Sequence, residues 1–291
     1  MSSVVTIAKK EFSDLVSSKI VIFILAFYII IFGLSFYNSY GSINIAELSS
    51  KSYYLYATPS ILANPAGFFA STLIMIICYY GSLVAIGVGY SSMSGDADGK
   101  ALGTLLVKPL YRDSIINGKL LGAFCFLFCI FWVSVAFYLA GLFLLFGGII
   151  AAHLLQFLII LPVVFLIYSL STMLFLSLSM LCCISFKNQS LALFTSFLSW
   201  IILDMLAYQS VMGNIVSFLQ LDKSTSLFFN SLIFYNILAY VSGALINGKG
   251  SIFDTSSMYF SYLLIPLVAL SLYCFVAILA TYASFIRRDI S

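Results

Sequence analysis

Residues 20–37 read IVIFILAFYIIIFGLSFY, and no charged side chain interrupts them. An α-helix rises 1.5 Å per residue, so about 20 such residues cross a hydrocarbon layer about 30 Å thick. Five further stretches are long and apolar enough to do the same: 67–92, 119–146, 153–185, 190–208 and 259–286. The sequence therefore predicts an all-α integral membrane protein with six transmembrane helices.

The composition of the whole chain supports this prediction. Of 291 residues, 63% are hydrophobic and 8% are charged, and the mean hydropathy is +1.13. Soluble domains are about 45–50% apolar and about 25% charged, so this chain has too few charges to cover a surface in water. Soluble enzymes, nucleic-acid-binding domains and disordered regulators are excluded, and no nucleic acid is expected as a partner.

The lysines and arginines are unevenly divided between the two sides that these spans define. With the N-terminus in the cytoplasm, ten of the thirteen fall inside, and only Lys51, Lys223 and Lys249 fall outside. Positive charge is enriched in cytoplasmic loops of membrane proteins. We therefore expect a multi-pass protein of the cell membrane with both termini in the cytoplasm.

Residues 1–19 are expected to form an amphipathic helix ahead of the transmembrane domain of residues 20–291. Its apolar face would consist of Val4, Ile7, Ala8, Phe12 and Leu15. Lys10, Asp14 and Ser17 lie on the opposite face. This pattern is typical of a helix lying along the cytoplasmic membrane surface, and a solvated basic leader is the alternative.

The outer loop of residues 209–258 contains a further uncharged stretch. Residues 226–246 are long enough to span the membrane, but a seventh span would place Arg287 and Arg288 outside. We therefore favour a re-entrant or interfacial helical region before the last span. A shorter outer loop is expected at residues 38–66.

Small residues repeat every fourth position in the second span, at Gly81, Ala85 and Gly89. Such a face lets another backbone approach closely. We expect it to be a contact between helices.

The spans contain few residues suited to catalysis or metal binding. His153 is the only histidine and falls at the outer end of the fourth span, so no Ser/His pair or histidine-based zinc site can form. Asp204 is the only acid inside a predicted span, and it either reaches the headgroups or lines a substrate path. Cys125 and Cys129 could hold a soft metal, but no histidine or acid is near them. No catalytic residue, cofactor or metal is expected.

Residues 243–249 (GALINGK) match most of a phosphate-binding loop, but Gly250 stands where a serine or threonine must bind magnesium. The expected topology also places this segment outside the cell, away from nucleotide. The chain is therefore expected to have no ATP site of its own.

The cytoplasmic loop of residues 93–118 is unusually rich in charged residues for this chain. Its leucines at 102, 105 and 106 form an apolar stripe at helical spacing, and Pro109 ends this short helix. The stripe either docks onto a partner or rests on the membrane.

This loop resembles the loop between the second and third spans of the membrane permeases of type-2 ABC exporters, particularly the NosY-like group. The residues that match the pattern are Asp96, Asp98, Leu102, Leu105, Leu106, Pro109, Arg112, Gly118 and Lys119. The basic N-terminal element, the six spans, the large outer loop and the basic C-terminus also resemble this family. The similarity therefore covers essentially the whole chain.

The resemblance implies an exporter subunit that is driven by a separate cytoplasmic ABC ATPase. The loop would be a coupling helix that fits a cleft of the ATPase. The coupling residues would be Asp96, Asp98, Leu102, Leu105, Leu106, Lys108, Pro109 and Arg112. A second permease subunit, identical or different, would complete the transporter. The alternatives are a secondary transporter, or a noncatalytic membrane anchor or receptor for a cytoplasmic partner.

Overall fold

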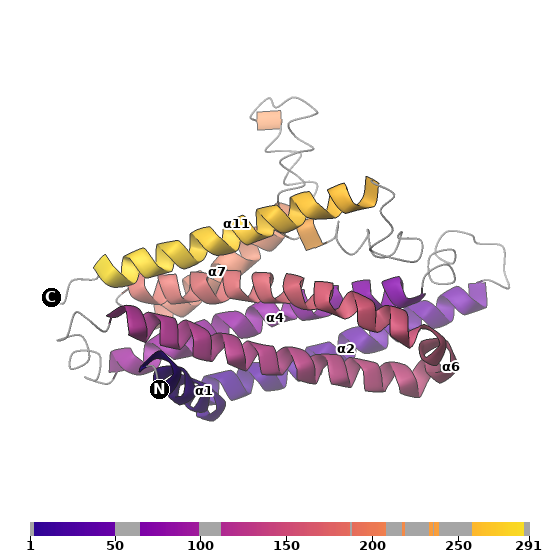
Figure 1. Ribbon diagram of the computed structural model, residues 1–291, viewed down its shortest axis with the longest axis horizontal. Helices are drawn as coiled ribbons and strands as arrows, with labels where there is room; N and C mark the ends of the chain where they lie inside the picture. Colours follow the sequence, from indigo (N-terminus) through magenta and orange to yellow (C-terminus); the bar gives the residue numbers. More distant parts are fainter. Residues whose placement is uncertain are drawn as a thin grey trace.

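The structure, a computed structural model, describes residues 3–49, 65–98, 112–186, 188–207, 217–218, 233–234, 236–238 and 258–287. Its main helices are α1 (Ser3–Ser17), α2 (Lys19–Ser49), α4 (Pro65–Asp98), α6 (Arg112–Ser185), α7 (Gln189–Ala207) and α11 (Met258–Arg287). The described part of the chain contains no β-strand. Figure 1 shows the long helices side by side in one bundle.

Among the residues that the structure describes, six helical segments are long and apolar enough to cross a membrane. They are Lys19–Tyr37, Ala66–Ser94, Ser114–Leu145, Ala151–Ser185, Gln189–Leu206 and Leu267–Arg287. Each overlaps one of the predicted spans, so the prediction of an all-α protein with six membrane-spanning helices is confirmed.

Helix α6 contains two of these spans and folds back on itself. The hydroxyl of Tyr168 donates to the carbonyl of Leu127 at 3.1 Å, although 41 residues of straight helix would separate them by about 60 Å. The midpoint of the chain between the two positions falls between residues 147 and 148, which are both glycine. Figure 1 shows the reversal at the end of the bundle away from α1. The sequence predicted two separate helices here, but the chain stays helical through the reversal, where no proline lies between residues 146 and 153. Pro162 lies further along, in the second arm of α6.

Helix α4 is the central helix of the bundle, with 72% of its most apolar window buried. A Cβ atom on Gly81 would lie 2.9 Å from the ring of Tyr168, and one on Gly89 would lie 2.7 Å from the backbone oxygen of Leu176. Both neighbours belong to the second arm of α6 (Ala151–Ser185). The prediction that the small-residue face is a helix contact is therefore confirmed.

Buried hydroxyl groups link neighbouring helices to one another. These hydrogen bonds run from Tyr138 to the Phe69 carbonyl (3.0 Å), from Ser179 to the Ile86 carbonyl (2.8 Å) and from Thr281 to the Ser177 carbonyl (2.9 Å). They join α6 to α4 twice and α11 to α6 once. In lipid, polar bonds of this kind add specificity to packing that has little hydrophobic driving force.

Three helices extend further than predicted. Helix α2 continues to Ser49 through a region predicted to be loop, because no proline occurs between residues 38 and 49. Helix α4 continues through Asp98 and α6 begins at Arg112. The two ends of the predicted loop 93–118 are therefore helical, and residues 99–111 lie outside the described residues.

The predicted extra helical region at residues 226–246 lies mostly outside the described residues. Its described part packs on the bundle. Ile237 is buried, and the rings of Phe234 and Phe175 make an edge-to-face contact with their centroids 5.1 Å apart. In Figure 1, α7 runs away from the α1 end of the bundle and α11 returns to it. The chain between α7 and α11 thus starts and finishes at the same end.

We expect Gly89→Ala to destabilise the protein by about 1–3 kcal/mol, because the new methyl group would overlap a backbone oxygen that cannot move independently. Thermal unfolding in detergent measures the effect. Gly147→Ala is the matched control, since a Cβ atom there meets nothing within 4 Å and alanine favours helix. Equal stability of the two variants would contradict the close approach of α4 and α6.

Candidate functional site

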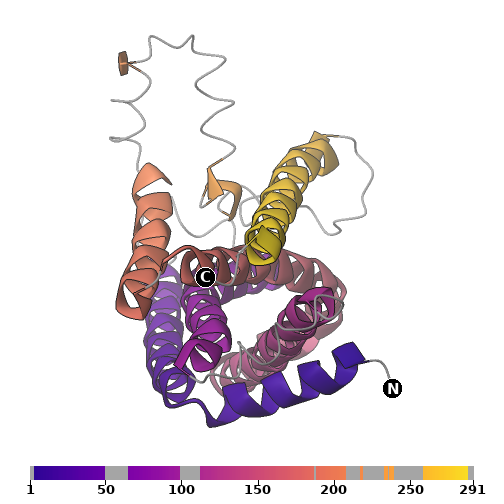
Figure 2. The ribbon, with the colours of Figure 1, turned by 90° about the vertical axis from the view of Figure 1, so that its left-hand side faces the viewer.

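Helix α1 lies crosswise over one end of the bundle, as Figure 2 shows from that end. Two glycines of α6 let it approach closely. A Cβ atom on Gly118 would lie 2.7 Å from the Ile7 side chain, and one on Gly122 would lie 2.7 Å from the Ala8 carbonyl oxygen. Larger residues at either position would force α1 away from the bundle.

The amphipathic pattern of α1 corresponds to its packing. Ala8 and Leu15 are buried, whereas Lys10, Asp14 and Ser17 are exposed. The apolar face is therefore directed at the protein itself. Its location along a membrane surface stays a prediction.

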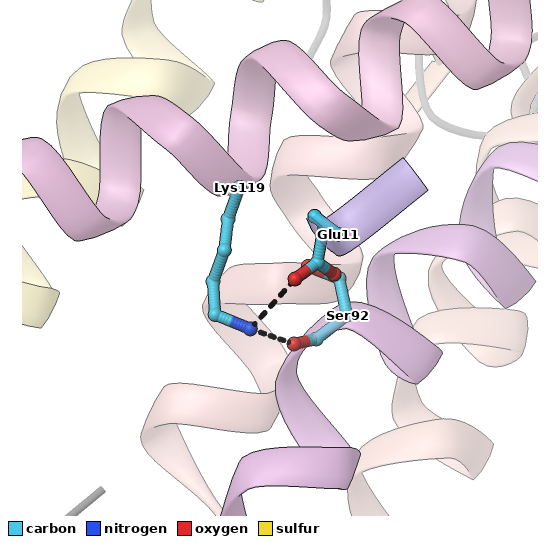
Figure 3. Close-up of polar contacts among 3 residues, drawn as sticks. All are labelled: Glu11, Ser92 and Lys119. Atoms are coloured by element: carbon cyan, nitrogen blue, oxygen red, sulfur yellow. Dashed lines mark hydrogen bonds and ion pairs between the residues drawn. The ribbon is translucent and has the colours of Figure 1, made fainter. Parts of the chain in front are cut away.

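Three residues meet where α1 packs on α4 and α6: Glu11 of α1, Ser92 of α4 and Lys119 of α6. We call them the Lys119 cluster. The Lys119 ammonium group lies 3.2 Å from a carboxylate oxygen of Glu11 and also donates to the backbone carbonyl of Ser92. Figure 3 shows the ammonium group joined by dashed lines to both acceptors. The side chain of Lys119 is 7% exposed and that of Glu11 is 10% exposed.

The cluster lies at the base of the loop that the sequence singled out. Ser92 precedes the end of α4 at Asp98, and Lys119 follows the start of α6 at Arg112. A single ammonium group therefore joins the helices on both sides of the loop and ties them to α1. A second link lies beside it, where the hydroxyls of Ser18 and Ser91 are 2.8 Å apart.

Removing two charges from water is costly, and the attraction between them offsets that cost only when the geometry is good and further hydrogen bonds are made. The Ser92 carbonyl supplies such a bond to Lys119. The hydroxyl of Ser92 is buried, and among the described residues it has no hydrogen-bond partner. The backbone of Ser92, not its side chain, is what the cluster uses.

Only some of the predicted coupling residues lie among the residues that the structure describes. Asp96 and Asp98 lie in the last turns of α4, and Arg112 is the first residue of α6. The others lie outside the described residues: Leu102, Leu105, Leu106, Lys108 and Pro109. Their role in coupling therefore stays a prediction.

Reasoning from the sequence missed the ion pair between Glu11 and Lys119. A signal was present, because Glu11 is three residues after Ala8 and four before Leu15 and so falls on the apolar face. Lys119 likewise falls at the start of a predicted span. A charge on an apolar face predicts a buried partner, although nothing local identifies that partner.

The other residues suited to catalysis or metal binding lie at separate places on the helices. Asp204 is partly exposed near the end of α7, and His153 forms a hydrogen bond with Gln156 at 3.0 Å. Cys125 and Cys129 are exposed on α6. Within the part of the chain that the structure describes, no three histidine, cysteine or acidic residues gather as metal ligands would.

We expect Lys119→Met to lower the free energy of unfolding by about 3 kcal/mol, because it leaves the Glu11 carboxylate buried without the ammonium group. The double variant Glu11→Met with Lys119→Met should recover most of this loss, since no charge is then buried. Unfolding in detergent, followed by circular dichroism, measures the free energy of unfolding of the original chain and of both variants.

Ser92→Ala is the matched control in the same cluster, because it keeps the carbonyl and removes only the hydroxyl. We expect its stability to stay within about 0.5 kcal/mol of the original chain. A loss as large as that of Lys119→Met would mean that the hydroxyl, not the carbonyl, holds the cluster together.

A family model matches nearly the whole chain. No curated protein matches it. The family model described as "ABC-2 family transporter protein" matches residues 5–290, a range that runs from α1 through α11 and includes the Lys119 cluster. The match confirms the resemblance to ABC permeases, while the NosY-like group stays a prediction. This chain belongs to the ABC-2 family of transporter proteins, as a multi-pass membrane subunit.

Proposed function

We propose that this chain is the transmembrane subunit of an ATP-driven exporter, and that a separate cytoplasmic ATPase binds the loop between α4 and α6. Membership of the ABC-2 family supports the dependence on an ABC ATPase. The direction of transport and the identity of the ATPase belong to the proposal. ATP hydrolysis takes place in the partner, and this chain moves the substrate.

The Lys119 cluster is the observation that carries the proposal. A loop that receives force from an ATPase needs a stiff base, because a flexible base would absorb the motion. Here one buried ion pair and one hydrogen bond hold α4, α6 and α1 together directly behind the loop. A push on the loop would thus move three helices as a unit.

The docking surface itself is the loop of residues 93–118. In the proposal, Leu102, Leu105 and Leu106 fill a cleft of the ATPase, and each leucine contributes about 1–3 kcal/mol through burial. Charged residues at the rim set orientation and contribute about 1 kcal/mol or less where they are solvated. The rim residues are Asp96, Asp98, Lys108 and Arg112.

We further propose that two permease subunits, identical or different, form the transport route at or near their interface. The bundle exposes many large apolar side chains on its surface, including Phe23, Phe137 and Leu144. These suit contact with lipid or with a second subunit better than an aqueous pore through one bundle.

The proposed orientation places the termini in the cytoplasm of a cell whose plasma membrane holds the complex. Ten of the thirteen basic residues then lie inside. The return of α11 to the end of the bundle where α1 lies agrees with an even number of spans (Figure 1). Residues 226–246 would then be re-entrant or interfacial, not a seventh span.

Leu105→Asp should abolish binding of the ATPase, because it places an unpaired charge in an apolar contact. The spans should stay folded, since the residue lies between the predicted spans 67–92 and 119–146. Co-purification of the ATPase, measured beside thermal stability of the permease alone, separates these effects. Leu105→Met, which conserves volume, is the control and should keep full binding. If the aspartate variant binds and transports normally, the loop is not the coupling element, and α1 becomes the next candidate.

Single cysteines introduced into a cysteine-free chain test the orientation. In intact cells, a membrane-impermeant maleimide should label Ser251→Cys, whereas Ser291→Cys should react only after permeabilisation. Labelling of Ser291→Cys in intact cells would mean that the chain crosses the membrane an odd number of times or in the opposite orientation.

A further inference from the structure

A groove of about 500 Å³ lies between α2 and the first arm of α6 (Ser114–Leu145) and reaches α1. Its floor is made of buried side chains, chiefly Tyr28, Phe32, Phe126 and Ile130. Its rim is exposed: Ile29 is 62% exposed and Phe137 is 66% exposed. The groove is therefore open on the side of the bundle that faces lipid or a neighbouring subunit.

The floor carries two hydroxyl groups, and both are satisfied by the protein. The hydroxyls of Tyr28 and Ser134 are 2.9 Å apart, and that of Ser134 also donates to the Ile130 carbonyl at 2.8 Å. A polar ligand would gain little from groups that are already paired. The walls thus favour an apolar occupant.

The length of the groove indicates which apolar occupant it suits. From Leu25 to Phe36 it extends about 16 Å along α2, which is about half of a hydrocarbon layer about 30 Å thick. The length of the groove therefore matches one acyl chain of one leaflet, and a helix of a second copy is the alternative occupant that the test distinguishes.

The end of the groove nearest α1 is positively charged. Phe12 and Val16 of α1 line that end, while Lys9, three residues before Phe12, and Lys19, three residues after Val16, are exposed. Asp14 is the exposed acid on α1. Basic residues beside an apolar site suit the phosphate of a lipid headgroup.

We infer that this groove binds one acyl chain of a phospholipid from the leaflet on the α1 side, with the lipid phosphate near the lysines of α1 and α2. The bound chain fills the space between α1, α2 and α6 and so becomes part of the packing at the end of the bundle where the Lys119 cluster lies. This inference depends on the membrane location of the chain and not on export or on an ATPase.

The test uses a phosphatidylcholine that carries a photoreactive diazirine on one acyl chain, with the protein reconstituted in vesicles of that lipid. Mass spectrometry maps the labelled peptides. Gly33 lines the groove, and a Cβ atom there meets nothing within 4 Å. Gly33→Leu should therefore fill the groove without disturbing the fold and should reduce labelling of residues 25–36 and 126–137 about tenfold.

Gly147→Leu is the matched control, because Gly147 is equally open but lies at the turn of α6. Its labelling should equal that of the original chain. Cys129→Phe is a second filling variant, at an exposed position that lines the groove, and it should reproduce the effect of Gly33→Leu. Unfolding temperatures in detergent show that each variant is folded.

Two results would overturn the inference. Labelling that is unchanged in both filling variants would mean that the groove binds no lipid chain. Rapid disulfide formation between two copies, in a chain whose only cysteine is Cys129, would mean that a second subunit covers this face.

Discussion

Lipid is as apolar as the side chains that it surrounds, so hydrophobic burial alone cannot decide how these helices pack. The fold depends instead on close approach of backbones, and α4 provides it. Gly81 and Gly89 bring α4 against the second arm of α6, close enough for Ser179 to donate to the Ile86 carbonyl. The other helices are arranged around this contact, and the same device, at Gly118 and Gly122, lets α1 join the end of the bundle.

The Lys119 cluster illustrates why a buried ion pair is not simply a source of stability. Its net contribution is small compared with the cost of breaking it, since desolvation cancels most of the attraction. What it provides is a preference for one arrangement, because the observed register of α1 on α6 brings Glu11 to Lys119. Apolar packing would tolerate several registers, and the charges select one.

Properties that arise locally could be predicted from the sequence. Span positions follow from length and apolarity, and the contact face of α4 follows from the spacing of its small residues. The continuity of α6 through residues 147 and 148 could not be predicted, because paired glycines favour either a break or a bend. The pairing of Glu11 with Lys119 could not be predicted either, because 108 residues separate the partners. Each residue, taken alone, is consistent with a charge at the membrane interface. The coupling residues from Leu102 to Pro109 rest on resemblance, because they lie outside the described residues.

The separation of Glu11 from Lys119 also sets an order of assembly during synthesis. At about 5–20 residues per second, a ribosome takes about 5–20 s to make the chain between them, so Glu11 waits that long for its partner. Until Lys119 is made the carboxylate is more stable in water, so α1 must remain at the surface while α2 and α4 enter the membrane. The first helix to be made is thus locked in place only after α2 and α4 have been made, and a nascent chain that stops before Lys119 lacks the group that holds its N-terminus.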